Sequence, residues 1–386
     1  MAGQGLGIVE SGSVRVRDGK IAKVRAGLRP ESGETVIDCR GGVVLPGFVD
    51  PHTHLVFGGW RAEEFEQRLA GKTYKEIAEA GGGILSTVEA TRSATEDGLY
   101  AKALRLLQEM VGWGTTTVEV KSGYGLDTPT ELKMLRVARR LARVGLARVV
   151  PTFLGAHAVP KGMEKADYVR LVTDEMLPAA AEAGQAVFCD VFCESFAFDS
   201  EESRRILEAG KRCGLVPTVH ADEIEPSGGA ELAAQVGAAS ASHLLRSSDE
   251  GLKAMADAGV VAVLLPGTGL FLRERHRPDV ARMRELGVAM ALGTDFNPGS
   301  CTTLAQPLTA QLACIHYGLT IVEALRGVTV NAARALRLDS EIGTLEPGRQ
   351  ADIVVADVPD YRHLAYRFGH NPVKKVIRQG CVVCEN

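Results

Sequence analysis

The chain has 386 residues, of which 45% are hydrophobic and 24% charged, an ordinary composition for a globular protein with a substantial core. Its net charge of −4 offers none of the basic surface that nucleic-acid binding needs, so we expect no nucleic-acid partner. No apolar run approaches the length of a membrane span, and the first residues lack the pattern of a signal peptide. We therefore expect a cytoplasmic protein with no membrane partner, built from one large domain and one smaller one.

Both ends of the chain have the composition of short strands. Near the start, residues 13–17 and 21–25 flank Asp18-Gly19-Lys20, which is a hairpin signal. Near the end, residues 351–356 and 374–380 are also strand-like. Neither terminal segment can bury a core alone. We therefore expect residues 1–48 and 346–386 to meet in space as one small β-sandwich domain.

Over residues 49–345, apolar, β-rich runs alternate with helical patterns, for example at 131–144 and 249–258. The runs end near eight positions: His54, Lys121, His157, Cys193, His220, His243, Pro266 and Asp295. Eight strand–helix repeats predict an α/β fold of the (β/α)₈ TIM-like barrel type, which typically needs ~250 residues. Active sites in that fold lie at the carboxyl ends of the strands, where all of the polar candidates fall.

The most informative motif is the histidine pair in Pro51-His52-Thr53-His54, directly after an apolar run. Successive side chains alternate along an extended strand, so the two imidazoles should point the same way. Together with His220 and Asp295 they would provide three imidazoles and a carboxylate, which leaves a position for water and is typical of a catalytic metal site. A zinc-bound water has a pKa of ~7. A single histidine of this kind is better interpreted as a polar residue that ends a strand. For the whole set of residues, a metal site is the better interpretation.

Three longer stretches carry a resemblance to a known family. They are DPHTHLVFGGWR at residues 50–61, VKSGYGL at 120–126 and GTDFNPGS at 293–300. With His220-Ala221-Asp222-Glu223 and His243, they resemble the imidazolonepropionase family, in the mononuclear branch of the amidohydrolase superfamily, along nearly the whole chain. The N-terminal segment looks short for that family, as if its first strand were missing.

The resemblance implies a barrel with a small β-domain from both termini, one Zn²⁺ or Fe ion per subunit and a homodimer. It implies the step of histidine degradation in which water opens the ring of 4-imidazolone-5-propanoate to give N-formimidoyl-L-glutamate. In this interpretation His52, His54, His220 and Asp295 bind the metal. Glu223, just beyond a strand, can reach both the water and a ring nitrogen of the substrate and is a candidate for moving protons between them. His243 is a second candidate for the general base, and the sequence does not separate the two roles.

The substrate carries a propionate, so the pocket needs a localised positive charge. Arg61 can pair with a carboxylate through two hydrogen bonds, although a lone arginine in a loop is usually a surface charge. Tyr124, in a glycine-flanked loop, is expected to donate its hydroxyl to the same carboxylate or to the ring. Tyr74 is a further candidate for substrate binding, although its surroundings could equally be the exposed start of a helix. His157 should face the barrel mouth and contact the substrate carbonyl; a structural histidine is its alternative.

Asn297, Gly299 and Ser300 precede a helix that we expect over residues 302–316. Free backbone N–H groups at a helix start favour anions and polar ligands, so these three residues are expected to bind the ring or the amino-acid end of the product. The plain alternative is that Ser300 caps the helix.

Two rival functions remain open. A deaminase of the same superfamily, acting on a cytosine- or guanine-like ring, would share the metal site but would not need Arg61 and Tyr124 for an anionic propionate. An inactive scaffold should have lost metal ligands, and none is missing. Lys121 ends a predicted strand where some dinuclear relatives carry a modified lysine that bridges two metals, and the mononuclear ligand set argues against that here.

Overall fold

The computed structural model describes residues 5–72, 76 and 82–386. Eight parallel strands form one sheet in the order β11-β10-β9-β8-β7-β6-β5-β4. Each pairs with the next strand along the chain, as a (β/α)₈ barrel requires. The strands are β4 (Phe48–Asp50), β5 (Thr115–Lys121), β6 (Arg148–Ala156), β7 (Phe188–Cys193), β8 (Val216–Ala221), β9 (Ser240–His243), β10 (Val261–Leu264) and β11 (Met290–Leu292). All eight predicted strand ends fall within four residues of these bounds.

The barrel closes through short segments beyond the strands. The N–H of His54 donates to the carbonyl of Phe296 at 2.8 Å, and the N–H of Asp295 donates to the carbonyl of His52 at 3.0 Å. Thr53 and Phe296 form a parallel bridge. Three residues predicted to bind the metal, His52, His54 and Asp295, therefore take part in closing the barrel.

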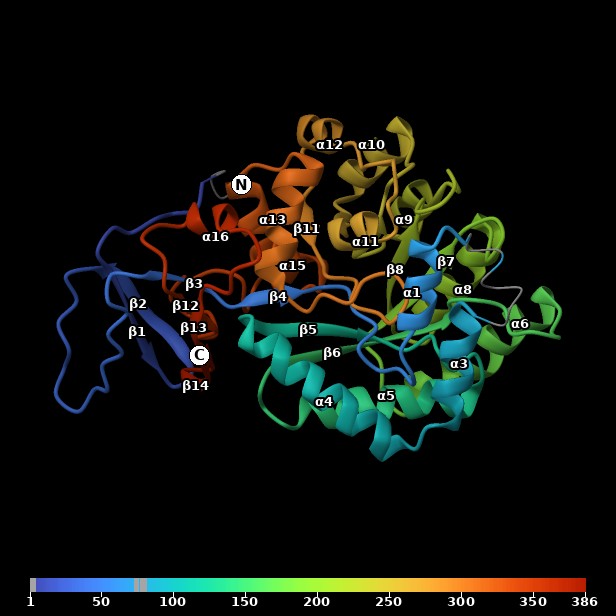
Figure 1. The fold of residues 1–386 in the computed structure, drawn as a ribbon, viewed down its shortest axis with the longest axis horizontal. Coiled ribbons are helices and arrows are strands. Elements are labelled where there is room, and N and C mark those ends of the chain that lie inside the picture. The colour runs from blue at the N-terminus through green and yellow to red at the C-terminus, as the bar shows by residue number, and fades with distance from the viewer. Residues whose placement is uncertain (1–4, 73–75, 77–81) are drawn as a thin grey trace.

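Helices surround the barrel, and their starts follow from local capping (Figure 1). The predicted helix at 249–258 is α10 (Asp249–Ala258), which begins after the Ser248 cap and ends at Gly259 in the left-handed region. The others are α1 (Ala62–Leu69), α3 (Ile84–Ser93), α4 (Glu96–Gly112), α5 (Thr128–Ala142), α6 (Lys165–Leu171), a π-helical turn (Val172–Met176), α7 (Leu177–Glu182), α8 (Ser200–Arg212), α9 (Gly229–Val236), α11 (Pro266–Phe271), α12 (Val280–Leu286), α13 (Gln306–Tyr317), α14 (Ile321–Gly327), α15 (Val330–Ala335) and α16 (His363–Tyr366). No helix in the described ranges is long and apolar enough to span a membrane.

The helix expected over residues 302–316 was placed too early. It begins at Gln306, with Ala305 at its cap position, and Ser300 does not cap it. The reason lies in Pro307, the second residue of the helix, which has no N–H to bond the carbonyl of residue 303 and therefore favours a helix start. Asn297 folds the preceding loop instead, since its Oδ1 accepts from the N–H groups of Gly299 and Ser300 at 2.8 and 2.7 Å. A side chain that folds the backbone back in this way competes with helix formation.

Strands from both ends of the chain lie together at one end of the molecule (Figure 1). An antiparallel sheet has the order β14-β13-β12-β3, from β3 (Val43–Pro46), β12 (Ile353–Ala356), β13 (Val373–Arg378) and β14 (Cys381–Glu385). The predicted hairpin is β1 (Gly12–Arg17) and β2 (Lys20–Ala26), and Ile21 donates its N–H to the carbonyl of Arg349 at 2.9 Å. Ile21 is buried with Ile353 and Ile377, so hairpin and sheet share a core. The predicted domain boundaries, with the barrel over residues 49–345 and the small domain on either side of it, stay a prediction.

Candidate active site

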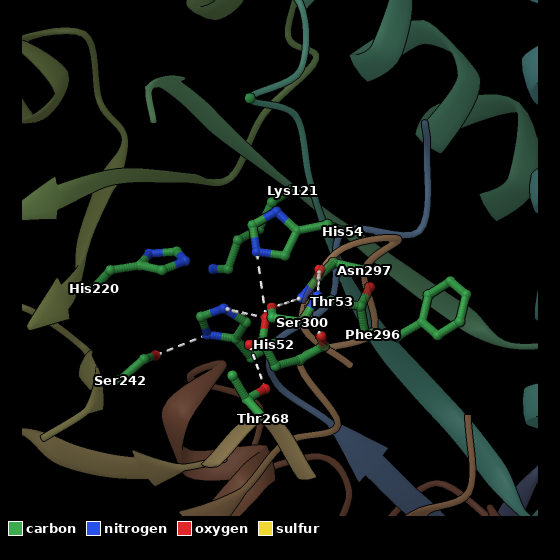
Figure 2. A network of polar contacts seen from close by, with 12 residues as sticks. His52, Thr53, His54, Lys121, His220, Ser242, Thr268, Phe296, Asn297 and Ser300 are labelled. Atoms are coloured by element: carbon green, nitrogen blue, oxygen red, sulfur yellow. Dashed lines mark hydrogen bonds and ion pairs between the residues drawn. The ribbon is translucent and has the colours of Figure 1, made fainter. Parts of the chain in front are cut away.

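Three histidines converge where the barrel closes. Figure 2 shows the imidazoles of His52, His54 and His220 turned toward a common space. One nitrogen from each ring lies within 4.8 Å of the others, and all three residues are buried. Asp295 joins them, since its Oδ1 lies 3.4 Å from Nε2 of His52 and 3.5 Å from Nε2 of His54. The sequence predicted these four residues as one group, and the fold brings them together.

The nitrogens at this centre suit a metal ion. Among the described residues, Nε2 of His52 and Nε2 of His220 find no hydrogen-bond partner although both are buried. Burial, reinforced by Lys121, lowers the pKa of His52 well below its ordinary value, and burial together with His157 does the same for His54. Both rings are therefore neutral, which is the form that binds metals. The cluster thus has the chemistry of a metal site.

Two hydroxyl groups hold ligands of this cluster in place. Ser242 places its Oγ 2.9 Å from Nδ1 of His52, and Thr268 donates to Oδ2 of Asp295 at 2.6 Å. Sequence reasoning missed both residues. Ser242 stands directly before His243 at the end of a strand, which is a weak signal, whereas nothing in the sequence around Thr268 indicates its contact.

The two proton-transfer candidates face one another. Nε2 of His243 lies 3.5 Å from Oε2 of Glu223. Burial, reinforced by Asp295, raises the pKa of Glu223 well above its ordinary value, while burial and His220 lower the pKa of His243. The backbone at Glu223 is fixed by Glu194, which accepts its N–H at 2.8 Å and that of Ile224 at 2.9 Å. A small cavity beside the pair is lined by Leu265, Thr268, Leu272, Glu274 and Tyr317.

His157 and Tyr124 also reach the centre. The ring of His157 stacks on His54 with centroids 5.1 Å apart, and Tyr124 lies 5.4 Å from His157. Nδ1 of His157 is 3.0 Å from the carbonyl of Gly123. Burial, with His220, lowers the pKa of His157 to about 3, so its ring is neutral. A neutral ring that donates from Nδ1 to this carbonyl has an acceptor at Nε2.

Buried Glu131 shapes the loop that carries Tyr124. It accepts backbone N–H groups from Gly123 at 2.8 Å, Gly125 at 2.7 Å and Leu126 at 2.8 Å. Gly123 has a φ of +106°, and a side chain there would crowd Nδ1 of His157. The glycines that flank Tyr124 are thus needed for close approach.

Arg61 and the Asn297 loop meet at the edge of the site. Arg61 donates from Nε to Glu64 at 2.8 Å, and a Cβ added to Gly299 would collide with Nη1 of Arg61. Arg68 donates to the carbonyl of Gly299 at 2.9 Å. Asn297 uses its amide to donate to the carbonyl of Asp295 at 2.8 Å and to Oγ of Ser300 at 2.7 Å. The N–H groups of Gly299 and Ser300 are therefore not free donors at a helix start, because Asn297 accepts both and the helix begins only at Gln306.

Two further residues from the sequence analysis remain. Tyr74 lies outside the described residues and stays a prediction. Lys121 pairs with two carboxylates, with Nζ 2.8 Å from Glu119 and 2.7 Å from Asp190. An ammonium held in this way does not fit a lysine modified to bridge metals.

Comparison with known proteins places the chain in a family. The model for the amidohydrolase family matches residues 43–383. An imidazolonepropionase of Geobacillus kaustophilus is 50% identical over 388 residues, covering 98% of this chain and 91% of that protein. One of Haloarcula marismortui is 47% identical and covers 99% and 92%. The chain belongs to the imidazolonepropionases of the amidohydrolase family.

Solved structures share the fold with this imidazolonepropionase family member. A 5-methylcytosine deaminase from Klebsiella pneumoniae matches with a TM-score of 0.75 at 20% identity, covering 97% of this chain and 94% of that one. An N-isopropylammelide isopropylaminohydrolase from Burkholderia multivorans matches with a TM-score of 0.73 at 21% identity, covering 96% and 94%. At these identities the likeness concerns the fold alone.

Proposed function

We propose that this protein hydrolyses 4-imidazolone-5-propanoate to N-formimidoyl-L-glutamate, the ring-opening step of histidine degradation. The observation that carries the proposal is its identity, along nearly its whole length, to proteins named imidazolonepropionase. The buried, neutral histidine cluster at the barrel mouth supports a hydrolysis that depends on a metal.

His52, His54, His220 and Asp295 would hold one Zn²⁺ or Fe ion per subunit. Such an ion supplies Lewis acidity and lowers the pKa of a bound water, which makes water a usable nucleophile at neutral pH. Imidazole and carboxylate ligands suit both metals. The closed barrel seam supports the assignment, because it holds Asp295 beside both histidines of the His-x-His pair.

Glu223 and His243 would move the protons. Their 3.5 Å separation allows one of them to take a proton from water while the other delivers a proton to the ring nitrogen that leaves. Glu194 limits motion of the Glu223 backbone and so keeps the pair together. Which of the two is the base stays open.

The remaining candidates would orient the substrate. Arg61 presents Nη1 beside Gly299, so the propionate would bind there while Glu64 keeps the guanidinium in position. Tyr124 would donate to the substrate from the opposite loop, with Asn297 and Ser300 lining the Gly299 side. His157, with an acceptor at Nε2, would accept an N–H of the substrate ring.

The test uses freshly prepared 4-imidazolone-5-propanoate and follows the loss of its ultraviolet absorbance. Protein is assayed as purified, after chelation and after reloading with Zn²⁺ or Fe²⁺, and ammonia is measured in the same samples. We expect the protein to consume the substrate without releasing ammonia. This activity should disappear on chelation and return when the metal is reloaded. No turnover by metal-loaded protein would contradict the substrate, and ammonia release would favour the deaminase alternative.

The expected homodimer is a separate proposal that rests on the resemblance. Sedimentation equilibrium of the metal-loaded protein tests it, because a chain of 41.1 kDa would sediment at twice that mass.

A further inference from the structure

A buried ionic cluster connects the two sides of the metal site. Glu119, Lys121 and Asp190 are each no more than 3% exposed. Nζ of Lys121 lies 2.8 Å from Oε1 of Glu119 and 2.7 Å from Oδ2 of Asp190. Figure 2 shows the Lys121 side chain directed toward His220. An isolated charge is costly to bury, so these three groups depend on one another.

One end of the cluster orients His220. Oδ2 of Asp190, the oxygen that Lys121 binds, also lies 3.1 Å from Nδ1 of His220. The two atoms are in contact without the alignment of a hydrogen bond. A negative charge so close to Nδ1 favours the tautomer with hydrogen on that nitrogen, which leaves the Nε2 lone pair for a metal. Burial would raise the pKa of Asp190, but Lys121 and His220 outweigh it and hold that pKa well below its ordinary value.

The other end holds the His-x-His segment. Oε2 of Glu119 accepts the N–H of Thr53 at 3.2 Å, and the carbonyl of Glu119 accepts the Thr53 hydroxyl at 2.6 Å. Lys121 adds a backbone bond, donating its N–H to the carbonyl of Thr53 at 3.0 Å. Because Thr53 lies between His52 and His54, the cluster spans the metal site from one ligand-bearing strand end to the other.

We propose that Glu119, Lys121 and Asp190 are positioning residues that set the affinity of the site for its metal by fixing His220 relative to the His52–His54 pair. This inference rests on the metal site of the proposed function. The cluster does not bind the metal itself. With one ammonium and two carboxylates it carries one net negative charge, so its electrostatic and its positioning effects can be separated by substitution.

The test measures the Kd of the full-length, metal-free protein for Zn²⁺ by competition with a chromophoric chelator. Loss of an outer carboxylate typically weakens a metal site about 10–100-fold, and we expect a weakening in that range for Asp190→Asn. Lys121→Met makes the cluster more negative, so a purely electrostatic effect would tighten Zn²⁺ binding; positioning predicts that it weakens binding too. The matched control is Asp352→Asn, which removes a buried carboxylate of the terminal sheet, where it accepts the N–H of Gln379, and should leave the Kd unchanged.

Co²⁺ provides a second readout that does not depend on activity. Its visible absorption spectrum reports ligand geometry, and we expect Asp190→Asn to change it while Asp352→Asn does not. Wild-type affinity and spectrum in Asp190→Asn would overturn the proposal, as would tighter Zn²⁺ binding by Lys121→Met. If Lys121→Met does not fold, the Zn²⁺ affinity and the Co²⁺ spectrum of Asp190→Asn together test the proposal. A wild-type protein that binds neither ion would overturn the metal site as well.

Discussion

Thr294 donates its hydroxyl hydrogen bond to Oδ2 of Asp50, 2.6 Å away, across the seam where the first and last barrel strands meet. The N–H of Thr294 donates to the other oxygen of the same carboxylate at 3.1 Å. Both residues are fully buried. Each is the immediate neighbour of a segment that bears metal-ligand candidates, so this contact sets how His52 meets Asp295.

Thr294→Val should therefore destabilise the fold. The change keeps the shape of the side chain but leaves a buried carboxylate short of a donor, which typically costs about 1–3 kcal/mol. Urea unfolding monitored by far-ultraviolet circular dichroism measures it. Thr117→Val is the control, because Oγ1 of buried Thr117 has no hydrogen-bond partner among the described residues. Equal unfolding midpoints for both variants would show that the seam contact contributes nothing.

Glu223→Gln and His243→Asn should each lower kcat by about 10²–10⁴-fold, the usual contribution of a general acid or base. Metal content, measured by atomic emission, should stay at the wild-type level. Glu225→Gln is the control on the same loop, since this exposed carboxylate accepts from Ser195 and lies apart from the His243 contact. If either test variant turned over substrate at a near-normal rate, its role in proton transfer would be wrong.

Arg61→Lys should raise KM more than it lowers kcat. The lysine cannot pair with Glu64 and still present a second nitrogen beside Gly299, so a charge-assisted bond to the propionate is lost. Such bonds contribute about 1.5–3 kcal/mol, which corresponds to about a 10–100-fold rise in KM. Arg136→Lys, on the outer helix α5, serves as the control because its partner is Glu96. An unchanged KM in Arg61→Lys would place the propionate elsewhere.

Acidification should lower the free energy of unfolding, in part through Glu323. Hydrogen bonds from Arg284, outweighing burial, lower the pKa of Glu323 to about 2 from an ordinary 4.5. The folded state thus binds this proton less readily than the unfolded state. The stability from this pair is present above the unfolded pKa and is lost as pH falls from 4.5 toward 2.

Glu323→Gln removes that titration. Between about pH 5 and pH 3, its free energy of unfolding in urea should fall less than that of the wild type, by a difference of at most about 1 kcal/mol because the pair is partly exposed. Glu285→Gln, on the neighbouring helix α12, is the control, as its partner Arg282 stays paired with Asp249. If the free energy of unfolding fell with pH equally in Glu323→Gln and in the wild type, the Glu323–Arg284 pair would not be formed in solution.

The local sequence pattern predicted much of the site, because side-chain alternation and helix capping depend only on residues close together in the chain. His52 and His54 lie beyond the end of β4, yet they still turn to one side, as the alternation of an extended chain requires. The start of α10 at Asp249 follows from Ser248 as its cap. The start of α13 at Gln306 has an equally local cause, since Pro307 has no N–H with which an earlier turn could be closed.

Asp190 shows where sequence reasoning stopped. A charged residue inside the apolar run of β7 signals a buried partner, because strands covered on both faces are otherwise apolar. The pattern could not say that the partners are Lys121 and His220, which lie on different strands. Thr268 and Ser242 carried even less signal.

The sequence by itself determined the alternation of strands and helices, the common side of His52 and His54, and the ends of strands as the place for chemistry. Hydrogen bonding and side-chain alternation within a few residues decide these features. The tertiary structure alone decided that Ser242 and Thr268 hold metal-ligand candidates, that Glu223 faces His243 and that Lys121 joins two carboxylates. These contacts depend on how the barrel closes and on the register between strands, which the packing of the whole core selects.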